Sequence, residues 1–500
     1  MRVSHRVSLN VSKVQSWLDE RFGLGPFWRS IFLRHIPIGL NWWYSLGSAA
    51  LFVFVIEAAT GILLAMNYSP TPEYAYDSVR FITYEQPFGW LIRGLHHWGA
   101  SAMVVLVLLH LVSVLVMGAY KYPREGIWIV GVGLLLLTLA YGFTGYLLPW
   151  DQKAYWATTV GTNMVGTIPV IGGDLLKLIR GGTGLGVVAL TRFFAVHALL
   201  LPVLLGALAA VHVALVIYHG VSVSPGLWHK GLPGQASTTD GGAPLSYHER
   251  YAAFKARGPN FWPELITEDL RTALVVFVVL VGLTVFFGVP LDERADPTDT
   301  TYIPRPEWYF MALFEMLKFF PGQLEWVGAA LLPALLVLLV LFVPALARGE
   351  ERRPLRRPAG MATLALVLIA LTGMTIRAYA TTPPSAVVER GVVLTSQQLR
   401  GRQLTDQQGC RSCHIIGGVV EVTEPKPGER EKVKGPRLDG IGARLTTADI
   451  HTFMEQPKRF NPDATMEPVI PPLNHADVEA ITQYLLTLSA DIPLTERSIR

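Results

Sequence analysis

The sequence is short of charged residues. Only 16% of its 500 residues are Asp, Glu, Lys or Arg, whereas 51% are hydrophobic, and soluble proteins carry roughly 25% charged residues. Apolar runs of about 20 residues predict membrane-spanning helices. Seven such runs are present: Trp43–Met66, His97–Met117, Ile127–Leu148, Phe194–Tyr218, Thr272–Val289, Val327–Ala345 and Met361–Ile376. The composition therefore excludes an ordinary soluble protein and predicts seven transmembrane helices.

The first 40 residues are polar and basic, so no cleavable signal peptide is expected before the first span. The first span is expected to act as its own insertion signal. The net charge of +4 does not indicate a nucleic-acid-binding protein. The basic residues instead gather in alternate connections: Arg2, Arg6, Lys13, Arg21, Arg29 and Arg34; Lys121 and Arg124; Arg348, Arg352, Arg353, Arg356 and Arg357. The positive-inside rule places these connections in the cytoplasm and the C-terminus outside.

Shorter segments flank the spans at both ends. Four apolar residues recur at helical spacing before the first span: Val14, Trp17, Leu18 and Phe22. They favour an amphipathic helix on the cytoplasmic membrane surface, although a solvated tail also fits so short a pattern. Past the last span, Thr381-Thr-Pro-Pro-Ser385 indicates a linker before a small polar domain. The sequence predicts three domains: residues 1–220, 221–380 and 388–500.

Two of the predicted spans each hold a pair of histidines. His96 and His110 lie in the run Gly94–Met117, and His197 and His212 lie in the run Phe193–Tyr218. A helix turns about 100° and rises about 1.5 Å per residue, so each pair faces nearly one direction at two depths. Four imidazoles in hydrocarbon need strong partners. We expect the first histidines of the two runs to clamp one heme iron near the outer face, and the second ones another near the inner face, with no open iron site.

A fifth histidine and four glycines refine this geometry. His97 lies about 140° around the helix from His110, so it is expected to be an interface residue. The first and third spans each carry glycines at 14-residue spacing: Gly47 and Gly61, Gly131 and Gly145. Glycine lets a flat macrocycle approach the backbone, although ordinary helix packing is the alternative.

The only two cysteines are Cys410 and Cys413, and His414 follows directly. This pattern indicates covalent attachment of heme c through two thioethers, with His414 as an iron ligand. A lone pair of cysteines supplies too few ligands for a zinc knuckle, and a disulfide is the other interpretation. No cysteine is left for an iron–sulfur cluster.

Four motifs carry a family resemblance: Arg93-Gly-Leu-His96, Gly145-Tyr-Leu-Leu-Pro-Trp150, Thr191-Arg-Phe-Phe-Ala-Val-His197 and Pro306-Glu-Trp-Tyr309. Over roughly residues 10–380 the chain resembles cytochrome b of the quinol–cytochrome c oxidoreductase (cytochrome bc) family. The 15-residue histidine spacing, Pro149-Trp-Asp-Gln152 and the seven spans resemble the photosynthetic and Gram-positive branch. The implied fold is all-α: a four-helix heme-binding bundle, three further spans and a small all-α C-terminal cytochrome c domain.

The resemblance also implies roles for particular residues. Glu307, Tyr146 and Tyr309 are expected to border an outer quinol-oxidation pocket, with Glu307 as the proton acceptor. Arg93 and Arg192 are expected to pair with heme propionates, with anchoring at the membrane interface as the alternative.

Further expectations concern the inner face and the C-terminal domain. His219 lies seven residues after His212 and could serve an inner quinone site, or it could be an ordinary interfacial histidine. The C-terminal domain resembles a small class I cytochrome c, in which the loop Gly435-Pro-Arg-Leu-Asp-Gly440 would orient the proximal histidine. Met466 is the expected sixth iron ligand before a terminal helix Asp477–Leu488, and Met454 is its competitor.

Two residues depart from the family pattern. Members of this branch often attach an extra heme through a cysteine in the first span, where this chain has Ser45. We therefore expect no covalent heme there. Glu57 stands where relatives tend to carry glutamine, and an ionised carboxylate at that depth is costly. Glu57 is hypothesised to tune a nearby heme potential, or to act as a neutral substitute for glutamine.

The resemblance implies a subunit that oxidises quinol outside a bacterial cytoplasmic membrane. One electron would pass to a separate Rieske iron–sulfur protein and on to the heme c, and the other would cross two b hemes to an inner quinone. Expected partners are the quinone pool, an external acceptor such as cytochrome c or a terminal oxidase, and a second copy in a homodimer. The alternative is a heme-bearing membrane anchor that relays electrons without quinol catalysis. Menaquinol and ubiquinol both stay open as substrates.

Overall fold

The computed structural model describes most of the chain. The described residues are 14, 16–23, 25, 32–230, 246–292, 294–297, 302, 304–381, 395–408, 410, 414, 416, 438, 440–460, 466 and 473–488. Within them the regular secondary structure is helical, and only isolated β-bridges occur. The predicted all-α fold is therefore confirmed.

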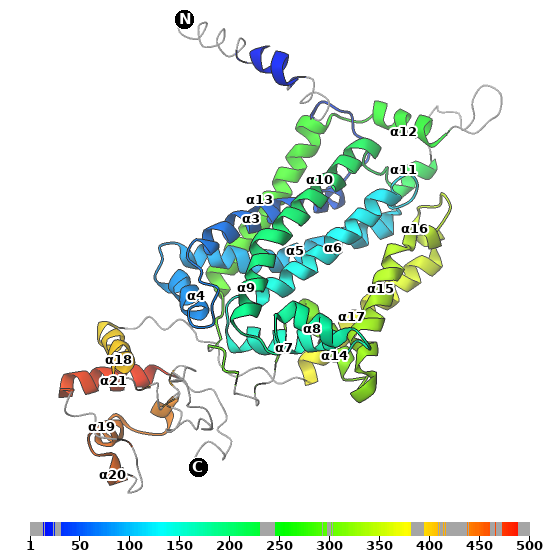
Figure 1. The fold of residues 1–500 in the computed structure, drawn as a ribbon. Coiled ribbons are helices and arrows are strands. Elements are labelled where there is room, and N and C mark those ends of the chain that lie inside the picture. The colour runs from blue at the N-terminus through cyan, green and yellow to red at the C-terminus, as the bar shows by residue number, and fades with distance from the viewer. Residues whose placement is uncertain are drawn as a thin grey trace, which may run out of the picture.

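Seven helices in the described part are long and apolar enough to cross a membrane, as predicted (Figure 1). They span Trp42–Ala65, Gly89–Met117, Glu125–Tyr146, Val187–His219, Phe261–Phe287, Gly322–Leu341 and Pro358–Thr381. Their main α-helical parts are α3 (Leu46–Ala65), α5 (Gly89–Met117), α6 (Glu125–Tyr146), α9 (Val187–Ala195) with α10 (Leu201–His219), α13 (Ile266–Phe287), α15 (Leu332–Leu341) and α17 (Pro358–Thr381).

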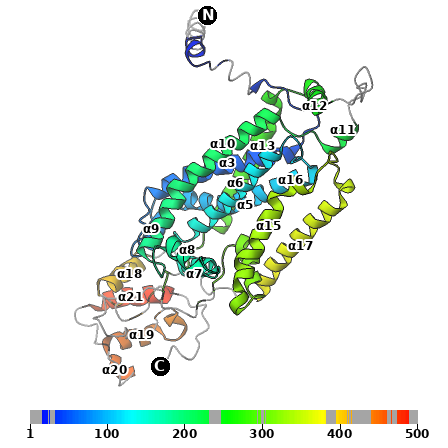
Figure 2. The same ribbon diagram turned by 45° about the vertical axis from the view of Figure 1, so that its right-hand side comes forward.

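The bundle has two distinct ends (Figures 1 and 2). One end gathers four short helices: α4 (Ala75–Tyr84), α7 (Gln152–Gly166), α8 (Gly172–Arg180) and α14 (Met311–Leu317). The other end gathers α11 (Pro225–Lys230), α12 (Tyr247–Ala256) and α16 (Val343–Leu346). Helices α3, α5 and α13 share an apolar core that includes Val53, Met103 and Leu280. The charge pattern predicts that the α7 end is the outer one, and the two ends are called outer and inner on that prediction.

Three spans contain a π-helical turn, and in two of them the turn ends two residues before a proline. The turn Val196–Leu200 precedes Pro202, and the turn Val327–Leu331 precedes Pro333. Proline has no N–H to donate to the carbonyl four residues earlier, so the helix adjusts locally. A π turn holds more residues than an α turn. The π turn therefore takes up the extra residue between His197 and His212. These two side chains lie on nearly the same face of their helix, as His96 and His110 do on α5.

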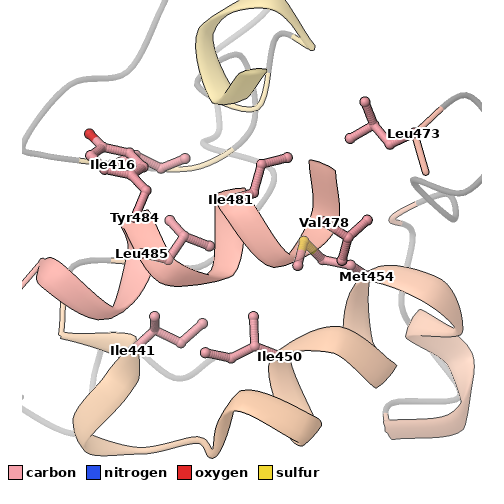
Figure 3. Close-up of a cluster of buried hydrophobic side chains, with 9 residues drawn as sticks. All are labelled: Ile416, Ile441, Ile450, Met454, Leu473, Val478, Ile481, Tyr484 and Leu485. Carbon is pink, nitrogen blue, oxygen red and sulfur yellow. The ribbon is translucent and has the colours of Figure 1, made fainter. Parts of the chain in front are cut away.

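The C-terminal described residues build a small core of their own (Figure 3). It lies among α18 (Ser396–Gln407), α19 (Thr447–Glu455) and α21 (His475–Thr487), and α20 (Pro457–Phe460) follows α19 directly. Helices α18 and α21 cross at Gly401, where a Cβ atom would clash with the carbonyl oxygen of Ala480. Glycine thus allows the two backbones to touch. The predicted terminal helix corresponds to α21.

Near the N-terminus, residues 14 and 16–22 are helical. Val14, Trp17 and Phe22 are largely exposed. An uncovered apolar side is what an amphipathic membrane-surface helix needs. That location stays a prediction.

Candidate functional site

The outer histidines of the two runs meet as the spacing predicts. The ring centroids of His96 on α5 and His197 in the π turn are 6.2 Å apart, and their planes are inclined by 79°. When one metal ion bonds a nitrogen of two opposed imidazoles at about 2 Å each, the ring centroids lie about 6 Å apart. The observed separation therefore fits a single iron held between the two rings.

Hydrogen bonds hold the far nitrogen of each outer ring. Nδ1 of His96 lies 3.1 Å from Thr60 Oγ1 and 3.1 Å from Glu57 Oε2. Nδ1 of His197 lies 3.2 Å from Thr144 Oγ1. Such partners fix the ring orientation and leave Nε2 available for a metal. Both threonines directly precede a glycine that the sequence analysis singled out.

The inner histidines, His110 and His212, differ in this respect. Nδ1 of each ring is buried and has no hydrogen-bond partner within the described residues. The residues that precede the facing glycines are Leu46 and Val130, which cannot supply a hydroxyl. The two ends of the bundle therefore hold their histidines differently.

Each of the four spaced glycines faces one histidine ring on a neighbouring helix. A Cβ atom at Gly47, Gly61 or Gly131 would lie 3.2 Å from Cε1 of the opposite imidazole. At Gly145 it would lie closer still to the ring of His197. Gly47 faces the ring of His110, Gly61 that of His96, and Gly131 that of His212. The glycines thus make room for the imidazoles themselves, which places the rings for a macrocycle between them.

The donor set fits heme better than a protein-bound metal ion. Among the described residues no group of three or more His, Cys, Asp or Glu side chains could enclose a metal. Each histidine pair could supply two ligands, and a porphyrin would supply the remaining four. His97 does not join either pair, and its ring contacts Trp98 with centroids 5.2 Å apart.

The outer end also brings together the residues of the expected quinol pocket. Tyr146 ends α6, and its hydroxyl donates to the Arg305 carbonyl at 3.4 Å. Glu307 forms an ion pair with Lys153, with 2.9 Å between Oε1 and Nζ. A Cβ atom at Gly142 would lie 2.8 Å from the Tyr309 hydroxyl. The pocket residues therefore come from α6, the first turn of α7 and the segment before α14.

Two groups at this end have a raised pKa. Burial, and secondly the charge of Glu307, raises the pKa of the Tyr309 hydroxyl, so it stays a hydrogen-bond donor. Burial also raises the pKa of the Asp151 carboxyl, and the N–H groups of Ala154 and Asp292 oppose that rise. Asp151 caps α7, with 2.7 Å to the Ala154 nitrogen. It follows Trp150, whose left-handed backbone (φ 53°) is rare for a non-glycine residue.

The two arginines expected at heme propionates bind backbone carbonyls. Arg93 is buried and donates to the carbonyls of Val289 (3.2 Å) and Pro290 (3.0 Å). Arg192 donates to the carbonyl of Leu178 at 2.6 Å. These bonds join α5 to the end of α13, and α9 to α8. A propionate role stays a prediction for both.

At the inner end, an arginine of the predicted cytoplasmic connections binds the end of a helix. Arg124 and Arg352 are buried. Arg124 donates to the carbonyls of Gly220 (2.9 Å) and, at 3.5 Å, His219. The His219 ring contacts the Tyr218 ring, with centroids 4.8 Å apart. Positive charge at a helix C-terminus is favourable, so Arg124 secures the end of α10. A quinone role of His219 stays a prediction.

In the C-terminal domain His414 is buried, and its backbone N–H donates to the carbonyl of Cys410 at 3.0 Å. Met454 belongs to the buried core on α19, and Met466 packs against the edge of that core. Cys413 and Pro436 lie outside the described residues. Heme attachment and the choice between the two methionines stay predictions.

Comparisons with known proteins address the membrane part. Two family models match, described as "Cytochrome b/b6/petB" for residues 32–220 and "Cytochrome b(C-terminal)/b6/petD" for residues 294–395. The "Cytochrome bc complex cytochrome b subunit" of Chlorobaculum thiosulfatiphilum is 36% identical over 373 residues, which cover 73% of this chain and 81% of the relative. The chain belongs to the cytochrome b family.

Two further similarities support this cytochrome b assignment. "Cytochrome b6" of Synechococcus sp. (strain JA-3-3Ab) is 42% identical over 212 residues, which are 42% of this chain and 99% of the relative. A solved structure titled "Hyperthermophilic respiratory Complex III" matches with a TM-score of 0.63 and 27% identity, over 74% of this chain and 92% of that chain. Family membership implies heme b, a multi-pass membrane location and electron transfer of the quinol-oxidising type.

Three residues of the cytochrome b site are not among those predicted from the sequence. Thr60 and Thr144 hold the outer histidines, and Lys153 holds Glu307. The threonines carry a signal in the sequence, because Thr-Gly occurs at both outer glycines and at neither inner one. Lys153 carries none, since its partner is 154 positions away.

Proposed function

We propose that this chain is the cytochrome b and cytochrome c fusion subunit of a bacterial quinol–cytochrome c oxidoreductase. The observation that carries the proposal is the outer histidine pair, with rings 6.2 Å apart. It lies at the end of the bundle that also holds Tyr146, one residue after the glycine that faces His197. An electron carrier and a candidate quinol pocket thus share one end.

Two b hemes are proposed, one held by His96 and His197 and the other by His110 and His212. When bound, they carry single electrons from the outer to the inner face. The chain itself contributes the ring orientation, through Thr60 at the outer face, and the space, through the facing glycines. Ser45 is buried in the first span, and we propose no covalent heme there.

At the outer site the proposed substrate is a membrane quinol. Glu307 accepts a proton from a quinol hydroxyl, and Tyr146 and Tyr309 line the pocket. The raised pKa of Tyr309 supports its role as a hydrogen-bond donor. One electron then goes to a Rieske protein on a separate chain, because the only two cysteines here are those proposed to hold heme c. His96 and His197 would hold the heme that takes the other electron, and His110 and His212 the heme that passes it inward, towards a quinone site for which His219 is a candidate.

The C-terminal domain is proposed to carry heme c through Cys410 and Cys413, with His414 and Met466 as iron ligands. The buried position of His414 supports this assignment, because heme ligands lie in water-poor surroundings. Electrons leaving the Rieske protein would pass through this heme to an external acceptor. The complex is proposed to sit in a bacterial cytoplasmic membrane as a homodimer, with the C-terminal domain outside.

The test uses the purified complex. A pyridine hemochrome assay should find two b hemes for each c heme, and quinol should reduce added cytochrome c. Glu307→Gln should lower kcat by about 100-fold, because it removes the proton acceptor. The matched control is Asp174→Asn, an exposed acid on α8 at the same end, which should keep the wild-type rate. A turnover rate that changes neither on Glu307→Gln nor on removal of the Rieske protein would instead favour a heme anchor without quinol catalysis.

A further inference from the structure

The ion pair between Lys153 and Glu307 is partly withdrawn from water. The side chain of Lys153 is 33% exposed and that of Glu307 is 20% exposed, and Lys153 Nζ lies 2.9 Å from Glu307 Oε1. Fully exposed pairs contribute little, because water and salt screen them. Partial burial strengthens the attraction and also raises the cost of leaving either charge alone. The position of each side chain therefore depends on the charge of the other.

Lys153 stands where a helix disfavours a cation. It is the second residue of α7 (Gln152–Gly166), in the first turn. The N-terminal end of a helix carries a partial positive charge, so a lysine in the first turn is unfavourable. The helix start already has its cap, because Asp151 accepts the Ala154 N–H. Local helix formation therefore gives no reason for a lysine at this position.

Glu307 likewise does not serve its own helix. It directly precedes the helical turn Trp308–Phe310, at the position from which a carboxylate often caps the first N–H groups. No capping hydrogen bond from its side chain is present. The carboxylate reaches across to α7 instead, so the contact with Lys153 replaces a stabilising local interaction.

The same ammonium group touches a second pocket residue. Nζ of Lys153 lies 5.6 Å from the centre of the Tyr146 ring, within the range of a cation–π contact. Lys153 thus joins the two residues that the proposed function places beside the quinol. Tyr146 is itself held by its hydrogen bond to the Arg305 carbonyl. The ammonium group therefore has a fixed place from which to orient the carboxylate.

We propose that Lys153 is a positioning residue for quinol oxidation, which docks the Glu307 carboxylate between turnovers. The inference rests on the proposed function. In the quinol step, the O–H bond of the quinol breaks, the proton forms a bond to a Glu307 oxygen, and the electron goes to the Rieske cluster. The neutral acid no longer attracts the ammonium group. Glu307 therefore leaves Lys153 only when it carries a proton, and it returns after the proton is released.

The test compares five variants of the purified complex with wild type, using a water-soluble quinol and added cytochrome c. Lys153→Met should lower kcat by about tenfold, because the carboxylate loses its fixed position, while KM changes less than about twofold. Lys153→Arg keeps the charge and should restore most of the rate. The control Lys177→Met removes an exposed lysine of α8 at the same end and should change neither parameter. Heme content, measured on every variant, verifies that each one is assembled.

The double variant Lys153→Met with Glu307→Gln separates this role from a general structural one. Because Lys153 acts through Glu307, the double variant should be no slower than Glu307→Gln alone, which is the signature of coupled residues. Additive losses, a wild-type rate for Lys153→Met, or no rescue by arginine would each overturn the inference. A wild-type rate for Glu307→Gln alone would instead overturn the proposed function, so the two failures are distinguishable.

Discussion

Replacing the glycines that face the histidines should displace the b hemes in a graded manner. A Cβ atom at Gly131 would lie 3.2 Å from Cε1 of His212, whereas carbon atoms prefer about 3.5–4.0 Å. The His212 ring must therefore move by about 0.3 Å or more. At Gly145 the overlap with the His197 ring is much larger. A ring bonded to iron cannot move without straining that bond.

The expected magnitudes follow from two opposing effects. Alanine is favoured over glycine within a helix by about 0.5–1 kcal/mol, and overpacking a tight site costs about 1–3 kcal/mol. Gly131→Ala should therefore destabilise the heme-loaded protein by about 1 kcal/mol, and Gly145→Ala by about 3 kcal/mol or more. The control is Gly206→Ala in α10, where the new Cβ atom lies at an ordinary 4.0 Å from Phe54 Cζ. This variant should match or exceed wild-type stability.

The assay is b-heme content per purified chain, followed by the temperature at which the b-heme absorption is lost. The expected order of stability is Gly206→Ala, wild type, Gly131→Ala, Gly145→Ala, from highest to lowest. The reasoning is refuted if Gly145→Ala retains a full complement of b heme and loses it at the same temperature as Gly206→Ala.

Two further predictions concern stability. Asp151→Ala removes the α7 cap and should cost about 1 kcal/mol. Since burial raises the pKa of Asp151, its carboxyl contributes fully below the unfolded value near pH 4 and less as the pH rises through the folded value. The loss in thermal unfolding should therefore be larger at about pH 4 than at about pH 8, and an equal loss at both would contradict this. Gly401→Ala should destabilise the C-terminal domain by about 3 kcal/mol, because the backbone of α21 cannot yield. Gly442→Ala makes its one tight contact, of 2.9 Å, with the flexible end of Leu486 and should cost less; equal thermal unfolding of the two would argue against the tight crossing.

Hydropathy predicts the number of spans but not where they begin. The second span starts at Gly89 instead of His97, and the fifth at Phe261 instead of Thr272. Polar side chains near these helix starts lower the mean hydropathy, which moves the predicted boundary inward. Arg93 shows why the helix continues regardless, because carbonyls at the end of α13 satisfy its guanidinium group. Those carbonyls are almost 200 positions away, and no local pattern reveals them.

In the candidate site as well, some contacts can be predicted from the sequence and others cannot. Helical spacing predicts that His96 meets His197, because regular geometry propagates along a span. In a regular α-helix, His197 and His212 would differ from His96 and His110 in the angle between the two side chains, because their spacing is one residue longer. The π turn before Pro202 removes this difference. Contacts between distant loops, such as Lys153 with Glu307, depend on how α7 and the segment before α14 fold together. They are absent from any short stretch of sequence.

The arrangement of glycines and histidines has a consequence for biogenesis. Gly47 and Gly61 face histidines on α5, the next span, and Gly131 and Gly145 face the histidines of the fourth span. The first four spans therefore form two consecutive hairpins, and each hairpin carries one histidine of each pair. The seam between the hairpins is where the proposed hemes would enter. Heme binding would then be the step that joins the two hairpins during assembly.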